Sequence, residues 1–242
     1  MPVGNGHLGR RTARGYSEWV PVHEDGLHVG GAVLRVGLTG GIAAGKSVVA
    51  RRLGALGAAV IDHDVLARTV VDVGTPGLAA IVAAFGDVLT PLGQLDRQAL
   101  GKRVFGDQAA RERLNAIVHP LVRTAAHDAE VVAVAAGHRV VVHDIPLLVE
   151  TGQAGHFDVL VVVDAPADLR VQRLVAGRGL TPSDAWARLA AQADDEARLD
   201  AADVVLDGSG AVAELEVQVD AMWERWAAAV EPLGARTPGV PG

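Results

Sequence analysis

The sequence contains no cysteine, which excludes disulfide bonds, thiolate metal sites and cysteine nucleophiles. It also has no excess of positive charge, because 22 Lys and Arg residues stand against 29 Asp and Glu residues, for a formal net charge of −7. General attraction to nucleic acid or to an anionic membrane requires concentrated positive charge, so we expect neither as a partner. Any phosphate group must therefore be bound by a dedicated local site.

Long hydrophobic runs are missing as well. No stretch approaches the roughly 20 apolar residues that span a bilayer, and residues 1–33 have no apolar run of the kind found in a signal peptide. Half of the residues are nevertheless hydrophobic, which is enough for one large core. We therefore predict a soluble, cytoplasmic protein that is not exported.

The two ends differ from the rest of the chain. Residues 1–33 mix Gly, Pro and charge without a period of 2 or 3.6, and residues 231–242 are rich in Pro and Gly. This composition predicts a poorly ordered leader and a disordered tail. A translation start assigned too early would explain the leader equally well.

Between the ends, short β-branched runs alternate with longer helical stretches. This alternation predicts a three-layer α/β fold, with a parallel five-stranded sheet and helices on both faces, although the strand order cannot be derived from it. The expected strands are 34–38, 58–61, 139–143, 159–163 and 203–206.

Four helical regions are expected around these strands. A helix should begin at Gly45 and end at Gly57, and helices should fill the insertion at about 65–136. Residues 168–200 form a further helical, Arg-rich segment. Residues 211–229 predict an amphipathic helix whose buried stripe is Val212, Leu215, Val219, Met222 and Trp226.

A phosphate-binding loop is the strongest motif. Gly40–Ser47 reads G-x-x-x-x-G-K-S directly after a predicted strand and before a predicted helix, which is the context this motif requires. The loop amides should surround the β-phosphate, Lys46 should bring its charge to the β and γ oxygens, and the Ser47 hydroxyl should bind Mg²⁺. The expected nucleotide-binding residues are Gly41, Ile42, Ala43, Ala44, Gly45, Lys46, Ser47 and Val48. A Gly-rich turn with a capping Ser would not explain Lys46.

ATP is the favoured nucleotide. A GTP switch protein normally reads guanine with N-K-x-D, and the two asparagines, Asn5 and Asn115, do not stand in that setting.

Three aspartates follow predicted strands. Asp62 and Asp64 come after the second strand, and Asp144 ends the third. One carboxylate could accept the proton of an attacking hydroxyl while Asp62 or Asp144 supports hydrated Mg²⁺. Alternatively, Asp62 and Asp64 merely cap the next helix.

The segment after the fourth strand carries five arginines: Arg170, Arg173, Arg178, Arg188 and Arg198. Arginines on one mobile helical lobe could close over ATP and neutralise charge on the transferring phosphoryl group. A solvated helix face is the alternative, and for Arg170, beside Asp168, we favour it.

Several separate blocks resemble the dephospho-CoA kinase family. They are GLTGGIAAGKS, VIDHDVLAR, LDRQAL, NAIVHPLV, DIPLLVE, QRLVAGRG and ARLAAQADDEARLDAADVVLDGSG, in that order over about residues 34–226. The HP pair at His119 and Pro120 and the PLLVE block from Pro146 to Glu150 are the distinctive ones.

The resemblance implies a phosphate-loop kinase with three lobes, spanning about residues 34–230. It implies a helical lobe for the CoA precursor at about 65–136 and a lid at about 168–200. The implied reaction is ATP-dependent phosphorylation of the ribose 3′-hydroxyl of dephospho-CoA, with Mg²⁺. By motif position, Asp64 resembles the catalytic base, Lys46 the phosphate-binding lysine and Arg173 the lid arginine.

The chain departs from the family pattern in two places. Ala43 and Ala44 stand where the family often has Gly and Ser, and a Cβ at Ala43 narrows the backbone angles open to the loop. Gly208 and Ser209 replace asparagines near the family's adenine site.

Two other functions are alternatives to the one that the resemblance implies: a kinase for another nucleotide-like alcohol, and a nucleotide-binding regulator without catalysis.

Overall fold

The computed structural model describes residues 33–192 and 195–230, so the predicted leader and tail lie almost wholly outside the described residues. Within these ranges, no helix has the length and apolar character required to cross a bilayer.

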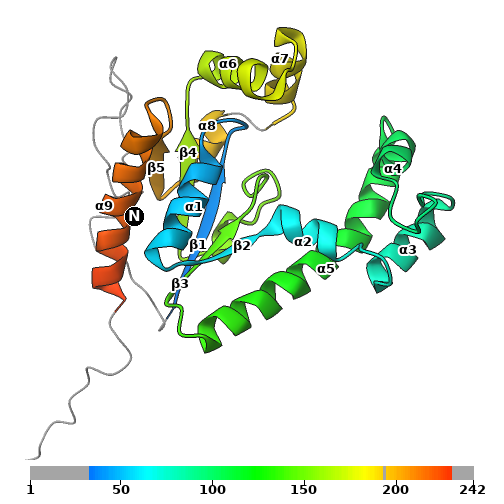
Figure 1. Ribbon diagram of the computed structural model, residues 1–242, viewed down its shortest axis with the longest axis horizontal. Coiled ribbons are helices and arrows are strands. Elements are labelled where there is room, and N and C mark those ends of the chain that lie inside the picture. Colours follow the sequence, from blue (N-terminus) through cyan, green and yellow to red (C-terminus); the bar gives the residue numbers. More distant parts are fainter. Residues whose placement is uncertain (1–32, 193–194, 231–242) are drawn as a thin grey trace, which may run out of the picture. The chain divides into compact units, whose positions relative to one another are not determined.

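Five strands form one sheet (Figure 1), in the order β2-β3-β1-β4-β5. β1 pairs in parallel with β3 and β4, and β4 pairs in parallel with β5. Every predicted strand is confirmed to within two residues at each end. The strands are β1 Leu34–Gly40, β2 Ala59–Asp62, β3 Val140–Asp144, β4 Val159–Asp164 and β5 Val204–Asp207.

The sheet is buried on both faces, which explains its nearly continuous apolar strands. In β4, Val161 and Val163 pack with α1 (Lys46–Leu56) and α9 (Val212–Ala229), while Leu160 and Val162 face the opposite side. On that side they pack with the segment after β3 and with α8 (Asp195–Asp200). The predicted α/β architecture is therefore confirmed.

The ends of α1 follow from its two flanking glycines. Gly45 has φ 120° and precedes the first helical residue, and Gly57 has φ 111° and terminates the helix. Both φ values lie in the positive region, which residues other than glycine avoid. The helix thus begins one residue later than predicted and ends as predicted, with Val49 and Leu53 fully buried.

The stripe predicted on α9 is correct at four of its five positions. Leu215, Val219, Met222 and Trp226 are buried, but Val212 is 54% exposed. Val212 is the first residue of the helix, ahead of the turns that carry the buried stripe. Those turns pack beside α1 (Figure 1).

The remaining helices of this part of the chain lie in the Arg-rich segment. They are α6 Ala167–Arg178 and α7 Pro182–Ala190, followed by α8, with a short 3₁₀ turn, η1 Ala154–His156, earlier in the chain. Thr181 begins α7 by accepting a hydrogen bond from the backbone N–H of Asp184, and Pro182 occupies the first helical turn. Both are favoured at a helix N-terminus.

The described chain divides into two compact units, of which Ile61–Ala133 is one. It holds α2 His63–Thr69, α3 Pro76–Phe85, α4 Arg97–Val104 and most of α5 Gln108–Ala135. Thr75 and Asp96 cap α3 and α4 through hydrogen bonds to backbone N–H groups. The helices share their own core of Val71, Ile81, Phe85, Val88, Leu100 and Ala110. The helical prediction for the insertion is confirmed.

Candidate nucleotide-binding site

The predicted phosphate loop occupies the turn between β1 and α1. The N–H of Ala44 donates to the carbonyl of Gly41 over 3.0 Å, which closes the turn. Lys46 and Ser47 then begin α1, so Ser47 is exposed in the first turn of the helix. The first N–H groups of a helix lack intrahelical acceptors and carry partial positive charge, which suits this end for phosphate.

Ala43 carries the strain that its Cβ predicts. Its φ is 62°, and it is the single non-glycine residue with positive φ in the part of the chain that the structure describes. A left-handed conformation costs an L-residue roughly 1–2 kcal/mol. Ala43 and Ile42 pack against Val171, Leu174 and Ala185 of α6 and α7, which helps to hold this conformation.

Lys46 forms an ion pair with Asp144, the last residue of β3. The Lys46 side chain is 21% exposed and that of Asp144 only 9%. Asp144 lies opposite Leu38 in the β1–β3 register, so the parallel sheet brings its carboxylate next to the loop. Of the candidate Mg²⁺ carboxylates, Asp144 is the one whose contact with the loop lysine is observed.

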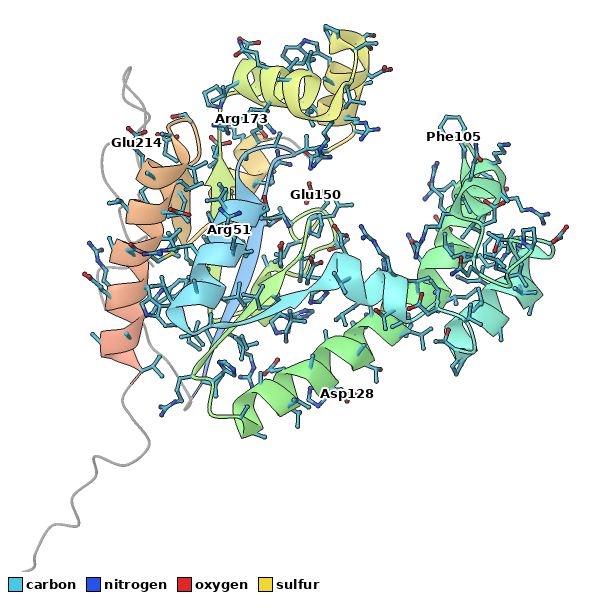
Figure 2. The ribbon with its side chains drawn as sticks, viewed as in Figure 1. Arg51, Phe105, Asp128, Glu150, Arg173 and Glu214 are labelled. Atoms are coloured by element: carbon cyan, nitrogen blue, oxygen red, sulfur yellow. The ribbon has the colours of Figure 1, made fainter. Side chains whose placement is uncertain are left out.

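Arg173 lies over the other side of the loop. Its Nη1 donates to the carbonyl of Ala43 over 3.2 Å, and its Nη2 donates to the carbonyl of Gly210 over 3.4 Å. Figure 2 shows Arg173 on α6, near the end of the sheet at which the loop lies. The arginine selected from the sequence is therefore in direct contact with loop backbone.

The prediction for Arg170 is wrong. It is not on a solvated face: the residue is 2% exposed and its Nη2 pairs with Asp195. Asp195 also pairs with Arg198, which is 2% exposed and donates to Glu150 Oε1 over 3.1 Å. An arginine can be buried when a carboxylate compensates its charge, and the carboxylate that compensates Arg170, that of Asp195, lies 25 positions later in the sequence.

Asp62 and Asp64 belong to the second compact unit, Ile61–Ala133. The Asp62 carboxylate accepts from the N–H of Asp64 over 2.8 Å and from the N–H of Val65 over 3.0 Å. Asp62 therefore caps α2, as one of the alternatives predicted. Asp64 lies in the first turn of α2 with an exposed side chain that takes no part in this cap.

Gly208, identified as a departure from the family pattern, lies against the loop. It follows β5, and its N–H donates to the carbonyl of Asp164 over 2.7 Å. A Cβ at this position would overlap the carbonyl oxygen of Ala44 and lie 3.1 Å from its carbon. Position 208 therefore has no room for a side chain while the loop keeps its conformation.

An ion pair fixes the helix that carries Lys46 and Ser47. Arg52 of α1 donates from Nε and Nη2 to the two carboxylate oxygens of Asp220 on α9, over 2.6 and 2.7 Å. These hydrogen bonds lower the pKa of Asp220 and raise the pKa of Arg52. The pair lies on the outside of the α1–α9 interface, beside the buried contacts of Val49 and Leu53.

Comparison with known proteins decides the family. The family model described as dephospho-CoA kinase matches residues 34–214. A dephospho-CoA kinase of Cutibacterium acnes is 54% identical over 83% of this chain and 87% of that protein. One of Thermobifida fusca is 52% identical over 79% of this chain and 96% of that protein. The chain belongs to the dephospho-CoA kinase family.

Solved structures share the fold of this chain. A Thermus thermophilus protein superposes with a TM-score of 0.70 at 33% identity, covering 79% of this chain and 97% of the other. The dephospho-CoA kinase of Campylobacter jejuni superposes with a TM-score of 0.62 at 24% identity, over 81% and 98% of the two chains, and supports the fold. The resemblance drawn from the motifs is confirmed.

Membership of the dephospho-CoA kinase family makes ATP the phosphate donor. The family match includes the loop, Asp64, Asp144, Arg173 and Gly208. Three residues next to the loop or to its contacts were not selected from the sequence: Gln192, Asp195 and Glu150. Of these three, Asp195 could have been identified from the sequence, because Asp195 and Arg198 have the i, i+3 spacing that places an ion pair on one face of a helix.

Proposed function

We propose that the protein transfers the γ-phosphoryl group of ATP to the 3′-hydroxyl of the ribose of dephospho-CoA, giving CoA and ADP. The observation that carries the proposal is the loop between β1 and α1, with Lys46 paired to Asp144 and Arg173 on the loop backbone. It occurs in a chain whose residues 34–214 match the dephospho-CoA kinase family. The support is thus both chemical and evolutionary.

The loop and its two cations would act on the phosphates. Backbone N–H groups at the start of α1 would bind phosphate oxygens, and the Lys46 ammonium would compensate charge on the β and γ groups. The Arg173 guanidinium, already against the loop, offers further N–H donors as negative charge develops in the transition state. These interactions position the γ-phosphoryl group for in-line attack.

Asp64 is proposed as the general base. The 3′-oxygen of the substrate forms a bond to the γ-phosphorus, the bond from that phosphorus to the β–γ bridging oxygen breaks, and the hydroxyl proton passes to the Asp64 carboxylate. Both side chains are exposed, but the Asp62 carboxylate accepts the two hydrogen bonds that cap α2, whereas the Asp64 side chain takes no part in this cap. The local geometry therefore favours Asp64 over Asp62 for this role.

The residues present fit a magnesium site. The exposed Ser47 hydroxyl and the Asp144 carboxylate are hard oxygen donors of the kind that Mg²⁺ prefers, and Mg²⁺ keeps several waters and binds substrate phosphates as well. We propose Ser47 and Asp144 as its protein contacts, because Asp144 reaches the loop lysine while Asp62 caps a helix. Bound there, the ion would neutralise phosphate charge.

A cytoplasmic location also stays a prediction.

A coupled assay tests the proposed reaction. The protein is incubated with ATP, Mg²⁺ and dephospho-CoA, and ADP and CoA are quantified in parallel. Equal amounts of ADP and CoA are expected. A panel of other nucleotide-like alcohols separates a kinase with a different acceptor, and ADP formation at background level with every acceptor would refute kinase activity.

The base is tested by Asp64→Asn, with Asp62→Asn as the comparison. General-base removal is expected to lower kcat by about 10²–10⁴-fold while ATP binding is retained. Asn caps a helix about as well as Asp, so Asp62→Asn should keep most activity if Asp62 only caps α2. Full activity in Asp64→Asn would remove Asp64 from this role, and an equal loss in Asp62→Asn would place Asp62 in the metal site.

A further inference from the structure

Four charged side chains, of which the two arginines are buried, form a chain of ion pairs beside the phosphate loop. Arg170 pairs with Asp195, Asp195 pairs with Arg198, and Arg198 pairs with Glu150. The side chains of both arginines are 3% exposed, and those of Asp195 and Glu150 are 35% and 16% exposed. The two positive and two negative charges compensate one another, which is what allows two guanidinium groups to lie in the interior.

Arg170 is the member of this chain that contacts the loop. A Cβ built at Gly41 would lie 3.0 Å from Arg170 Cζ, closer still to Nη1, and 3.4 Å from Cδ. The guanidinium thus fills the space that a side chain at position 41 would occupy. Arg170 and Gly41 are therefore complementary in shape.

The same part of the chain holds the next residue of the loop. Gln192 Oε1 accepts a hydrogen bond from the N–H of Ile42 over 2.8 Å. Gln192 lies between α7 and α8, and Arg170 lies on α6. Two consecutive residues at the start of the loop are thus held by side chains from a segment at least 128 positions later in the sequence.

The buried position of Arg170 distinguishes it from Arg173. Arg173 donates to loop carbonyls from a partly exposed side chain, which suits it to contact a bound phosphate. Arg170 is 2% exposed and its charge is compensated by Asp195, so it reaches a phosphate only through the loop that it supports.

We propose that Arg170 is a positioning residue for ATP, which sets the conformation of the phosphate loop at Gly41 and is itself fixed by Asp195, Arg198 and Glu150. The proposal deepens the proposed function, because it rests on the loop binding ATP. It does not depend on which alcohol accepts the phosphoryl group.

A double-mutant cycle between positions 41 and 170 tests the proposal. Gly41→Ala places a methyl group against the Arg170 guanidinium and is expected to raise the Kd for ATP about tenfold, which is about 1.4 kcal/mol. Arg170→Ala alone should raise it about fivefold. In the double variant the methyl group has room, so the Kd should stay near that of Arg170→Ala, and two multiplicative losses would overturn the proposal.

The readout is ATP binding by titration calorimetry on folded protein, without the second substrate. A failure of the dephospho-CoA assay therefore leaves this test valid, and the two proposals can fail separately. Arg225→Met, at an exposed position of α9, is the matched control and should leave the Kd for ATP unchanged.

A purely structural role for Arg170 predicts a different result. It would lower the melting temperature, but the folded variant would keep the wild-type Kd for ATP. The coupling energy between positions 41 and 170 would then be zero. If Arg170→Ala does not fold, Arg170→Met keeps most of the buried volume with a flexible neutral chain. The cycle is then run with that variant, where full additivity with Gly41→Ala refutes the pairing in the same way.

Discussion

Substitution of Gly208 by Ala should displace the phosphate loop. The new Cβ would overlap the carbonyl oxygen of Ala44 and lie 3.2 Å from the carbonyl oxygen of Asp164. The strand end cannot yield easily, because the N–H of Gly208 is already bonded to Asp164 over 2.7 Å. Restoring an ordinary van der Waals separation requires a shift on the order of 1 Å, and the loop is the part that moves.

The expected loss follows from that displacement. A misplacement of about 1 Å can cost about 100-fold in rate, so kcat/KM for ATP should fall by about that factor, or about 2.7 kcal/mol. Overpacking should also lower stability by about 1–3 kcal/mol. The rate is measured by continuous ADP release with saturating dephospho-CoA, and stability by urea unfolding.

Gly177→Ala is the matched control for this substitution. Gly177 lies inside α6, and a Cβ there meets no atom within 4 Å. Ala is a better helix former than Gly by about 0.5–1 kcal/mol, so this variant should be slightly more stable and fully active. If Gly208→Ala keeps the wild-type kcat/KM for ATP, the contact between position 208 and the loop does not set the loop conformation.

Two further outcomes are expected. Ala43→Gly should raise the free energy of unfolding in urea by about 0.5–1 kcal/mol. Removing the Cβ at φ 62° relieves backbone strain, and this gain exceeds the cost of the added flexibility of the unfolded chain. A destabilised variant would show that packing of the methyl group dominates. Hydrogen bonding to Arg52 lowers the pKa of Asp220, so this carboxylate stabilises the fold above its unfolded pKa and loses that effect as the pH falls through its folded pKa. Asp220→Asn should therefore melt below wild type at pH 7 and approach it as the pH falls through the folded pKa, which lies below the unfolded value of about 3.9. A difference independent of pH would contradict the assignment.

The strands and the loop could be predicted because their signals are local. Strands buried on both faces are continuous apolar runs, and the loop is a fixed spacing of Gly, Lys and Ser between a strand and a helix. The strand order could not be predicted, since it depends on which segments pair across the chain. Arg170 was misplaced for the same reason: on its own helix it resembles a solvated residue, and its burial depends on Asp195.

The sequence motif does not specify every glycine that the loop conformation needs. The motif specifies Gly40 and Gly45, and a Cβ at these positions would clash with Val163 of β4 and with Leu215 of α9. Gly41 is equally restricted, by Arg170 of α6, although it occupies a variable position of the pattern.

Gly208 extends this reasoning to a residue outside the motif. Its backbone lies directly against Ala44, so the conformation of the loop in this chain leaves no room for a side chain just after β5. Segments from β4, α6, β5 and α9 thus each contribute one surface that determines the path of the loop backbone. Because these surfaces come from residues 163–215, the loop conformation that binds phosphate is a property of the tertiary structure. The eight-residue motif contains only those determinants of this conformation that occur at a fixed spacing in the sequence.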